Sequence, residues 1–317
     1  MARSTDRAGA GVTEPLVWLP FSPEHLVEPP AGLRYEVVRP EPGEPLPPSA
    51  AEVEVYVPAY QMGPVDPDLF THLPRLKVVQ TLTAGVDHIR GAVPDGVVLC
   101  NGRGIHDTST AELALTLVLA SLRGIPAFVR AQDRSRWEPE RRESLADKRV
   151  LIVGHGQIGA AIEARILPFE AEVVRVARRA RPGVHAIAEL PSLLPDADVV
   201  VLIVPGTAET RHLVDEDFLG RMKSGALLVN MARGSVVDHD ALATALHDGR
   251  ISAALDVTEP EPLPPDHPLW SAPNLLLTPH VGGASSAMWP RAYRVVREQL
   301  ERYARGETLA NQVTGEY

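Results

Sequence analysis

Short runs of consecutive apolar residues alternate with helical patterns through the second half of the chain. Arg149–Val153 is the clearest of these runs, and the segment 157–167 that follows it has helical spacing. Strands that are apolar on both faces and alternate with helices are typical of a parallel sheet covered on both sides. The other strands expected in this sheet are 172–176, 198–204, 226–230, 252–256 and 274–278, with a helix over 238–246.

A second, smaller α/β unit is expected over residues 15–101. Its predicted strands are the short apolar runs 16–19, 53–57, 78–81 and 97–99. Ala, Leu and Val at helical spacing predict one helix over 108–130, and a last helix is expected over 284–305. Residues 1–14 have neither pattern and are interpreted as a flexible leader.

The composition indicates an ordinary globular chain and argues against a general polyanion binder. Of the 317 residues 44% are hydrophobic, and the formal net charge is −10, whereas a general nucleic-acid or anionic-membrane binder presents a basic surface. No stretch approaches the ~20 apolar residues of a membrane span, and the N-terminus lacks the apolar run of a signal peptide. We therefore expect no nucleic-acid partner, no membrane partner and no metal site.

The single cysteine, Cys100, rules out an intrachain disulfide and fits a reducing cytoplasm. It directly follows the apolar run 97–99. A small, buried strand residue is therefore expected here in preference to a catalytic thiol.

A glycine-rich turn follows the strand 149–153. The sequence Gly-His-Gly-Gln-Ile-Gly, residues 154–159, stands between this strand and the next helix. In that context Gly154 permits a tight turn, Gly156 lets the backbone approach a pyrophosphate, and Gly159 lets helix and strand pack closely. The free N–H groups of the helix terminus attract phosphate. We expect Gly154, His155, Gly156, Gln157, Ile158 and Gly159 to bind a dinucleotide.

The end of the next strand predicts which dinucleotide is preferred. An NAD-selecting domain places Asp or Glu there to bond the adenosine ribose, but this strand ends at Ala177. Arg178 and Arg179 follow, with Arg181 two residues further on. Guanidinium groups hold a 2′-phosphate with paired charge-assisted hydrogen bonds. NADP(H) is therefore expected to be preferred, with NAD(H) possible; a solvated basic loop without selectivity is the alternative.

Three charged residues follow predicted strands of the larger sheet. Arg233 comes after strand 226–230, Glu261 after 252–256, and His280 after 274–278. Ligands of open α/β sheets bind at the carboxyl ends of the strands, so these side chains are expected to meet there. His280 can donate a proton near neutral pH, Glu261 can fix its tautomer, and Arg233 can bind a carboxylate and polarise a carbonyl.

Each of these roles has a structural alternative. Arg233 could pair with Glu261 or Asp238, and His280 could close a turn after Pro279. Glu259 competes with Glu261 as the partner of the histidine.

Several sequence motifs, which follow one another in a fixed order, indicate a family resemblance. The chain resembles the D-isomer-specific 2-hydroxyacid dehydrogenase family, which includes glyoxylate/hydroxypyruvate reductases. The likeness runs from about residue 81 to 280. Besides the glycine turn, the matching stretches are Thr-Ala-Gly-Val-Asp (83–87), Thr-Ala-Glu-Leu-Ala (110–114), Pro-Gly-Thr-Ala-Glu-Thr (205–210), Asn-Met-Ala-Arg-Gly (230–234), Asp-Val-Thr-Glu-Pro-Glu-Pro-Leu (256–263) and Pro-His-Val-Gly-Gly (279–283).

The resemblance implies an α/β fold of two domains with a cleft between them. A Rossmann-type doubly wound parallel sheet, residues 102–283, would bind the dinucleotide. A smaller flavodoxin-like substrate domain would comprise 15–101 with 284–317. The family also implies a homodimer built around the cofactor domains, and a reaction that reduces a small 2-keto acid such as glyoxylate or hydroxypyruvate to the D-2-hydroxy acid.

The resemblance also implies site residues. It assigns catalysis to Arg233, Glu261 and His280, and the family pattern Glu-Pro-Leu selects Glu261 over Glu259. The backbone N–H groups of Ala84 and Gly85 would hold the substrate carboxylate together with Arg233. Further cofactor contacts are expected from Pro205, Thr210 and Asp256, the last near the nicotinamide carboxamide. Three residues are held only as candidates: Trp137 and Trp289 for pocket walls, and His106, for which a surface or capping role is preferred.

Two other functions compete with this one. A nucleotide-sensing interaction module, like the corepressor branch of the family, could use the same fold without turnover. A phosphoglycerate dehydrogenase-like activity is the alternative among enzymes. Formate dehydrogenase is disfavoured because that branch has Gln at the position of Glu261.

Overall fold

The computed structural model describes residues 13–41, 43–60 and 65–314, which divide into two compact units. The smaller contains 13–102 with 292–314, and the larger contains 103–291. The leader expected over 1–14 lies outside the described residues except for its last two. Residues 284–291, predicted with the smaller unit, lie in the larger one; within it, the Ser109 and Ser285 hydroxyls are 2.6 Å apart and tie this segment to a helix of that unit.

The smaller unit is built on five parallel strands in the order β2-β1-β3-β4-β5, the order of a flavodoxin-like sheet. The flavodoxin-like sheet predicted for the smaller unit is thus confirmed. The elements of this unit are β1 (Leu16–Leu19), β2 (Arg34–Val37), β3 (Val53–Tyr56), α1 (Asp68–Thr71), β4 (Val78–Gln80), β5 (Val98–Cys100) and most of α8 (Met288–Ala304). Cys100 is fully buried in β5, as its sequence context predicted.

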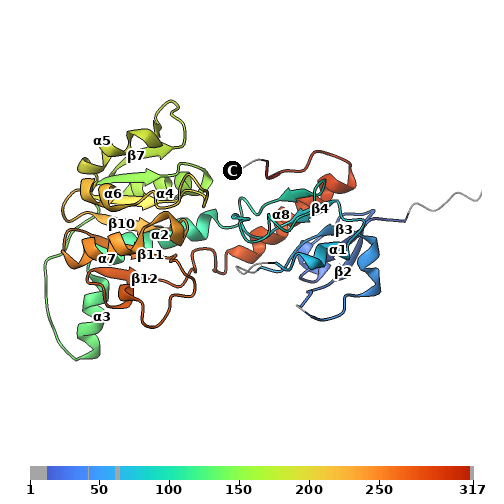
Figure 1. Cartoon of the computed structure of the whole chain (residues 1–317), viewed down its shortest axis with the longest axis horizontal. Helices are drawn as coiled ribbons and strands as arrows, with labels where there is room; N and C mark the ends of the chain where they lie inside the picture. The colour runs from blue at the N-terminus through green and yellow to red at the C-terminus, as the bar shows by residue number, and fades with distance from the viewer. Residues whose placement is uncertain (1–12, 42, 61–64, 315–317) are drawn as a thin grey trace, which may run out of the picture. The chain divides into compact units, whose positions relative to one another are not determined.

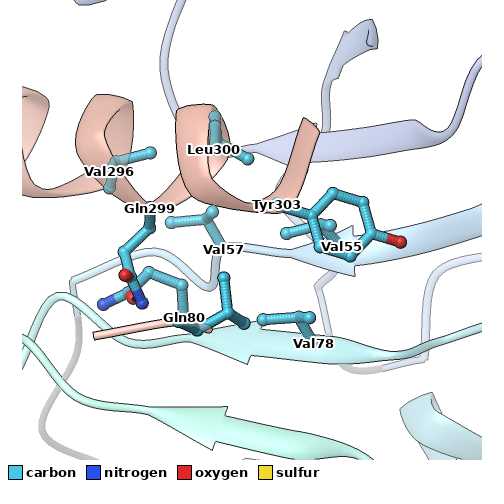
Figure 2. A pocket seen from close by; sticks show the side chains of 9 residues that line it. Val55, Val57, Val78, Gln80, Val296, Gln299, Leu300 and Tyr303 are labelled. Carbon is cyan, nitrogen blue, oxygen red and sulfur yellow. Dashed lines mark hydrogen bonds between the residues drawn. The ribbon is translucent and has the colours of Figure 1, made fainter. Parts of the chain in front are cut away.

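Helix α8 covers one face of this sheet and closes a small cavity above it (Figure 2). Val296 and Leu300 face Val55 and Val78 there, which explains the apolar stripe on an otherwise polar helix. The buried Gln299 side chain donates to the Gln80 Oε1 atom at 2.9 Å, so the polar groups beneath the helix are paired.

The larger unit contains seven parallel strands in the order β12-β11-β10-β9-β6-β7-β8 (Figure 1). The order reverses between β6 and β9, which makes that point the switch where doubly wound sheets bind ligands. The strands are β6 (Arg149–Val153), β7 (Glu172–Ala177), β8 (His185–Ala186), β9 (Val199–Leu202), β10 (Leu227–Asn230), β11 (Ser252–Leu255) and β12 (Leu275–Leu277). The helices are α2 (Asp107–Leu122), α3 (Ile125–Asp133), α4 (Gln157–Ile166), α5 (Leu190–Leu193), α6 (Glu216–Arg221) and α7 (His239–His247).

The unbroken apolar strands are explained by two cores, one on each face of this sheet. Val150 and Ile152 of β6 pack with α2 and α4, whereas Leu151 and Val153 face the core formed with α6 and α7. Successive strand side chains point to opposite faces, so a strand buried on both sides needs apolar residues at every position.

The helix predicted over 108–130 is instead two helices. Gly124 adopts the left-handed region at φ +64° between α2 and α3, and Pro126 stands in the first turn of α3. Left-handed glycine ends a helix and proline favours a new first turn, so these two residues outweigh the apolar spacing. Among the described residues no single helix is long and apolar enough to span a membrane; α2 and α3 reach that length only together, across a bend of 67°.

Candidate active site

The glycine turn leaves β6 and enters α4 with the geometry that a dinucleotide requires. Gly154 has φ +109°, and a Cβ there would collide with the Ile203 carbonyl oxygen. A Cβ on Gly159 would collide with the carbonyl of Gly154, so helix and turn touch at this point. At Gly156 the space is open, which leaves the backbone accessible to a phosphate. These three environments match the three glycine roles, and the turn fits a dinucleotide.

The other expected cofactor residues of this unit lie on loops after the strands. Arg178 and Arg179 are exposed beyond β7, where Ala177 takes the place of the acid. In the loop after β9, the buried Thr210 hydroxyl donates to the Pro205 carbonyl at 2.7 Å, so these two residues hold the loop together.

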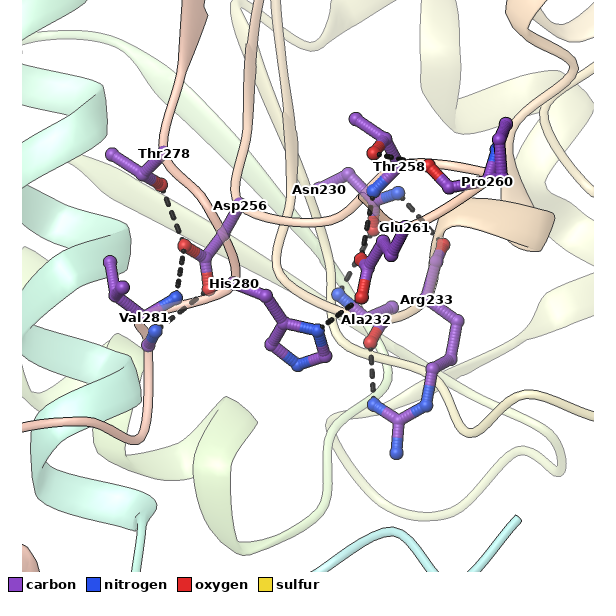
Figure 3. Close-up of polar contacts among 11 residues, drawn as sticks. Asn230, Ala232, Arg233, Asp256, Thr258, Pro260, Glu261, Thr278, His280 and Val281 are labelled. Carbon is purple, nitrogen blue, oxygen red and sulfur yellow. Dashed lines mark hydrogen bonds and ion pairs between the residues drawn. The ribbon is translucent and has the colours of Figure 1, made fainter. Parts of the chain in front are cut away.

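His280 and Glu261 meet at the carboxyl edge of the sheet (Figure 3). The His280 Nδ1 atom lies 2.7 Å from the Glu261 Oε2 atom. The Thr258 N–H donates to the other oxygen of this carboxylate at 3.0 Å, which fixes its direction. An ionised carboxylate only accepts, so Nδ1 carries the proton of this bond and Nε2 points away from Glu261.

The Glu261 carboxylate is held in its charged form. Burial favours the neutral acid, but the hydrogen bond and charge of His280, the Thr258 N–H and the Arg233 charge outweigh it, so the pKa of this carboxyl is lowered.

Glu259 does not take this role. Its carboxylate pairs with Arg211 at 3.0 Å. The structure therefore separates the two competing acids, and the Glu261 side chain is the one that reaches the histidine.

Arg233 lies in the turn after β10, with its guanidinium on the same side of the site as the His280 ring (Figure 3). The fully buried Asn230 side chain holds this turn: it accepts from the Ala232 N–H and donates to the Arg233 carbonyl, both at 2.9 Å. The residue after Arg233 must be glycine, because a Cβ on Gly234 would collide with the Thr258 backbone. Sequence reasoning missed Asn230, although it opens the motif Asn-Met-Ala-Arg-Gly.

Asp256 holds the turn that carries His280. Its Oδ1 atom accepts from the Thr278 hydroxyl at 2.6 Å and the Val281 N–H at 2.9 Å, and Oδ2 accepts from the Gly282 N–H at 2.8 Å. Its backbone carbonyl accepts from the His280 N–H at 2.7 Å. His280 itself adopts φ +52°, a strained conformation for a non-glycine residue that persists only when its surroundings impose it.

The remaining candidates are placed as follows. Ala84 and Gly85 lie partly exposed in the loop after β4 of the smaller unit. Trp137 is 95% exposed and Trp289 is 40% exposed. His106 is the N-cap residue of α2 without a side-chain cap hydrogen bond, and it is buried, so the surface interpretation was wrong.

Comparison with known proteins agrees with this arrangement. The model of the family described as "D-isomer specific 2-hydroxyacid dehydrogenase, NAD binding domain" matches residues 115–282. A glyoxylate reductase of Korarchaeum cryptofilum is 35% identical over 268 residues, 80% of each chain. A D-3-phosphoglycerate dehydrogenase of Methanocaldococcus jannaschii is 34% identical over 259 residues, which are 78% of this chain and 49% of that protein.

Among solved structures, a D-isomer specific 2-hydroxyacid dehydrogenase from Xanthobacter autotrophicus Py2, in complex with NADPH and MES, is similar over nearly the whole chain. The TM-score is 0.80 at 32% identity, covering 95% of this chain and 98% of that one.

Proposed function

This chain belongs to the D-isomer specific 2-hydroxyacid dehydrogenase family, and we propose that it reduces a small 2-keto acid, glyoxylate or hydroxypyruvate, to the D-2-hydroxy acid with NADPH. The observation that carries the proposal is the His280–Glu261 contact of 2.7 Å at the sheet edge that also bears Arg233 and the glycine turn. The substrate choice is supported by the glyoxylate reductase relative.

The residues divide the chemistry between them. NADPH, when bound, supplies the hydride that reduces the substrate carbonyl carbon. Arg233 binds the substrate carboxylate and polarises the carbonyl, so it stabilises charge that develops on oxygen. His280 donates a proton from Nε2 to that oxygen, and Glu261 keeps Nδ1 protonated and the ring in place. Ala84 and Gly85 are proposed to bind the same carboxylate through their N–H groups.

Two features support NADPH as the preferred cofactor. Ala177 replaces the acid that would bond a free ribose hydroxyl and repel a 2′-phosphate, and Arg178 and Arg179 follow it. The similar structure from Xanthobacter autotrophicus was solved with NADPH.

The single cysteine, Cys100, is buried and unpaired by a disulfide, which fits the reducing cytoplasm as the place of action.

A spectrophotometric panel tests the proposal. We expect NADPH oxidation with glyoxylate and hydroxypyruvate to exceed that with pyruvate and longer 2-keto acids, and NADPH to be a better donor than NADH. Oxidation of 3-phosphoglycerate as the best reaction would favour the alternative raised by the phosphoglycerate dehydrogenase relative. Cofactor binding without turnover on any substrate would overturn the enzyme proposal and favour a nucleotide-sensing module.

We also propose that the chain forms a homodimer through α3 and the segment after it. Helix α3 lies at the margin of its unit (Figure 1), and Ile125, Val129 and Trp137 are exposed by 48%, 50% and 95%. Ile125 and Val129 lie one helical turn apart on α3, and exposed apolar side chains that lie together mark interaction surfaces. Light scattering should give the mass of two chains for the wild type and one for Val129→Asp/Trp137→Ser. Leu167→Asp, at another exposed apolar site, is the control and should stay dimeric; a monomeric wild type would contradict the proposal.

A further inference from the structure

The loop that carries Glu261 is attached to the start of helix α7 by a histidine that the proposed chemistry does not use. Asp238 caps this helix: its carboxylate accepts from two backbone N–H groups of the first turn, at 3.0 and 3.1 Å. The cap fixes the first helical residue, His239, whose Nδ1 atom lies 3.0 Å from the Glu259 carbonyl oxygen. Glu259 stands two residues before Glu261, so His239 holds the loop close to this acid.

Bonds within the loop connect this contact to the Glu261 carboxylate (Figure 3). The Thr258 N–H donates to the Glu261 Oε1 atom at 3.0 Å, and the Thr258 hydroxyl donates to a carbonyl of the same loop at 3.0 Å. On the other side, the Glu259 carboxylate pairs with Arg211 at 3.0 Å. A shift of the Glu259 backbone would therefore move the carboxylate that orients the catalytic imidazole.

The contact requires the neutral form of His239. The Glu259 N–H lies 3.4 Å from Nδ1, farther than the carbonyl oxygen, so the carbonyl is the partner of this atom. A carbonyl oxygen only accepts, so Nδ1 carries the ring proton and Nε2 is left as an acceptor. Within the described part of the chain this buried Nε2 atom has no hydrogen-bond partner. A second proton on the ring would place a charged donor where nothing accepts it.

A second histidine lies beside the ring of His239. The rings of His239 and His267 meet edge to face, with their centroids 6.1 Å apart. His267 is held at the start of the short 3-10 helix Pro268–Ser271, where its Nδ1 atom accepts from the Leu269 N–H at 3.2 Å. Two neighbouring imidazoles do not both take up a proton easily, so His267 adds to the cost of a charged His239.

Carboxylates near His239 act in the opposite direction but do not prevail. Burial lowers the pKa of His239; the bond to the Glu259 carbonyl opposes this, His267 adds to it, and the Glu259 and Asp238 carboxylates oppose it, with a lowered pKa as the result. Both carboxylates also face other cations, because Glu259 pairs with Arg211 and Asp238 lies 3.9 Å from the ring of His212. Helix α6, which also packs against α7, has its own charges paired, Arg221 with Asp217 at 2.6 Å.

We propose that His239 is a pH-sensitive positioning residue: its neutral ring holds the Glu259 backbone, and through it the Glu261 carboxylate, and its protonation releases the loop. The inference rests on the proposed reductase function. It predicts a fall of kcat on the acid side of neutrality, whereas loss of the His280 proton causes a fall on the alkaline side. The folded chain disfavours the second proton on His239, so the hold is complete above the ordinary histidine pKa of ~6.5 and is lost as the pH falls through the lowered value.

Variants of His239 separate the hold from the titration. His239→Asn keeps a side-chain N–H donor but cannot titrate, so kcat at neutral pH should stay within about two-fold of wild type and the acid-side fall should disappear. His239→Leu loses the donor, so kcat should fall about 5- to 10-fold at neutral and acidic pH alike. His247→Asn, at the exposed other end of α7, is the matched control and should keep the wild-type profile. An acid-side fall that survives in His239→Asn, or a wild type without one, would overturn the proposal.

An NMR titration of the full chain tests the same point without turnover. The ring of His239, identified by its absence from His239→Asn, should be the Nδ1-protonated tautomer at neutral pH. Its second proton should bind below the ordinary histidine range, and the Thr258 and Glu259 amide resonances should shift with it. A wild type that reduces no 2-keto acid would defeat the proposed function alone. Amide resonances that do not follow the titration of His239 would defeat this inference whatever the activity.

Discussion

His280→Ala should lower kcat for reduction of the 2-keto acid by about 10²- to 10⁴-fold, the range that a positioned general acid contributes. The Kd for NADPH should stay near the wild-type value, because the contacts of His280 are to Glu261 and to the Asp256 carbonyl and not to the glycine turn. Steady-state kinetics and a cofactor titration on the same preparation separate the two quantities. His247→Ala, a change at the end of α7, is the control and should leave both unchanged.

The pH dependence gives this prediction a second readout. Reduction needs a proton on the imidazole, so kcat/KM should fall on the alkaline side as that proton is lost. The pKa of Glu261 is lowered, so its carboxylate stays charged through the neutral range and keeps accepting from the His280 Nδ1 atom. Glu261→Gln should move the alkaline fall to lower pH as well as reduce kcat. Full turnover in His280→Ala, or an unmoved pH profile in Glu261→Gln, would remove the pair from the mechanism.

The larger sheet could be predicted because its physical signal is strong and local. Arg149–Val153 and its parallel neighbours are buried on both faces, so nearly every position is apolar, and the glycine turn marks where the first helix begins. Strand β2, Arg34–Val37, was missed for the opposite reason. It is an edge strand of the smaller sheet with the sequence Arg-Tyr-Glu-Val and is only partly buried, so no apolar run reveals it.

The charged residues of the site could be predicted from the sequence, but the groups that hold them in place could not. Arg233, Glu261 and His280 were found because each follows a strand of a parallel sheet. What holds them could not be read from spacing: the turn of Arg233 packs at Gly234 against the Thr258 backbone, and the Asp256 carboxylate accepts from backbone N–H groups of the His280 turn. Such partners are brought together by the tertiary fold alone.

Asp256 is the clearest example of a support that the sequence pattern does not reveal. Its substitution should have the second largest effect on kcat. Asp256→Asn replaces one acceptor oxygen by an amide NH₂ group, which is a donor. In one orientation this NH₂ group faces the Gly282 N–H, and in the other it faces the Val281 N–H and the Thr278 hydroxyl. An unpaired buried donor costs about 1–3 kcal/mol. We expect the turn to relax from the strained His280 conformation, and kcat to fall about 10²- to 10³-fold with little change in KM, since misplacing a catalytic group by about 1 Å has effects of this size.

The double variant Asp256→Asn/His280→Ala distinguishes positioning from a direct role. If Asp256 acts through His280, the double variant should be no slower than His280→Ala, because the turn has no proton donor left to position. Thr278→Val, which removes one of the three carboxylate contacts, should cause a much smaller loss. If the two losses multiply, or if Asp256→Asn weakens NADPH binding in proportion to kcat, Asp256 acts on the nicotinamide directly and its hold on the His280 turn is secondary.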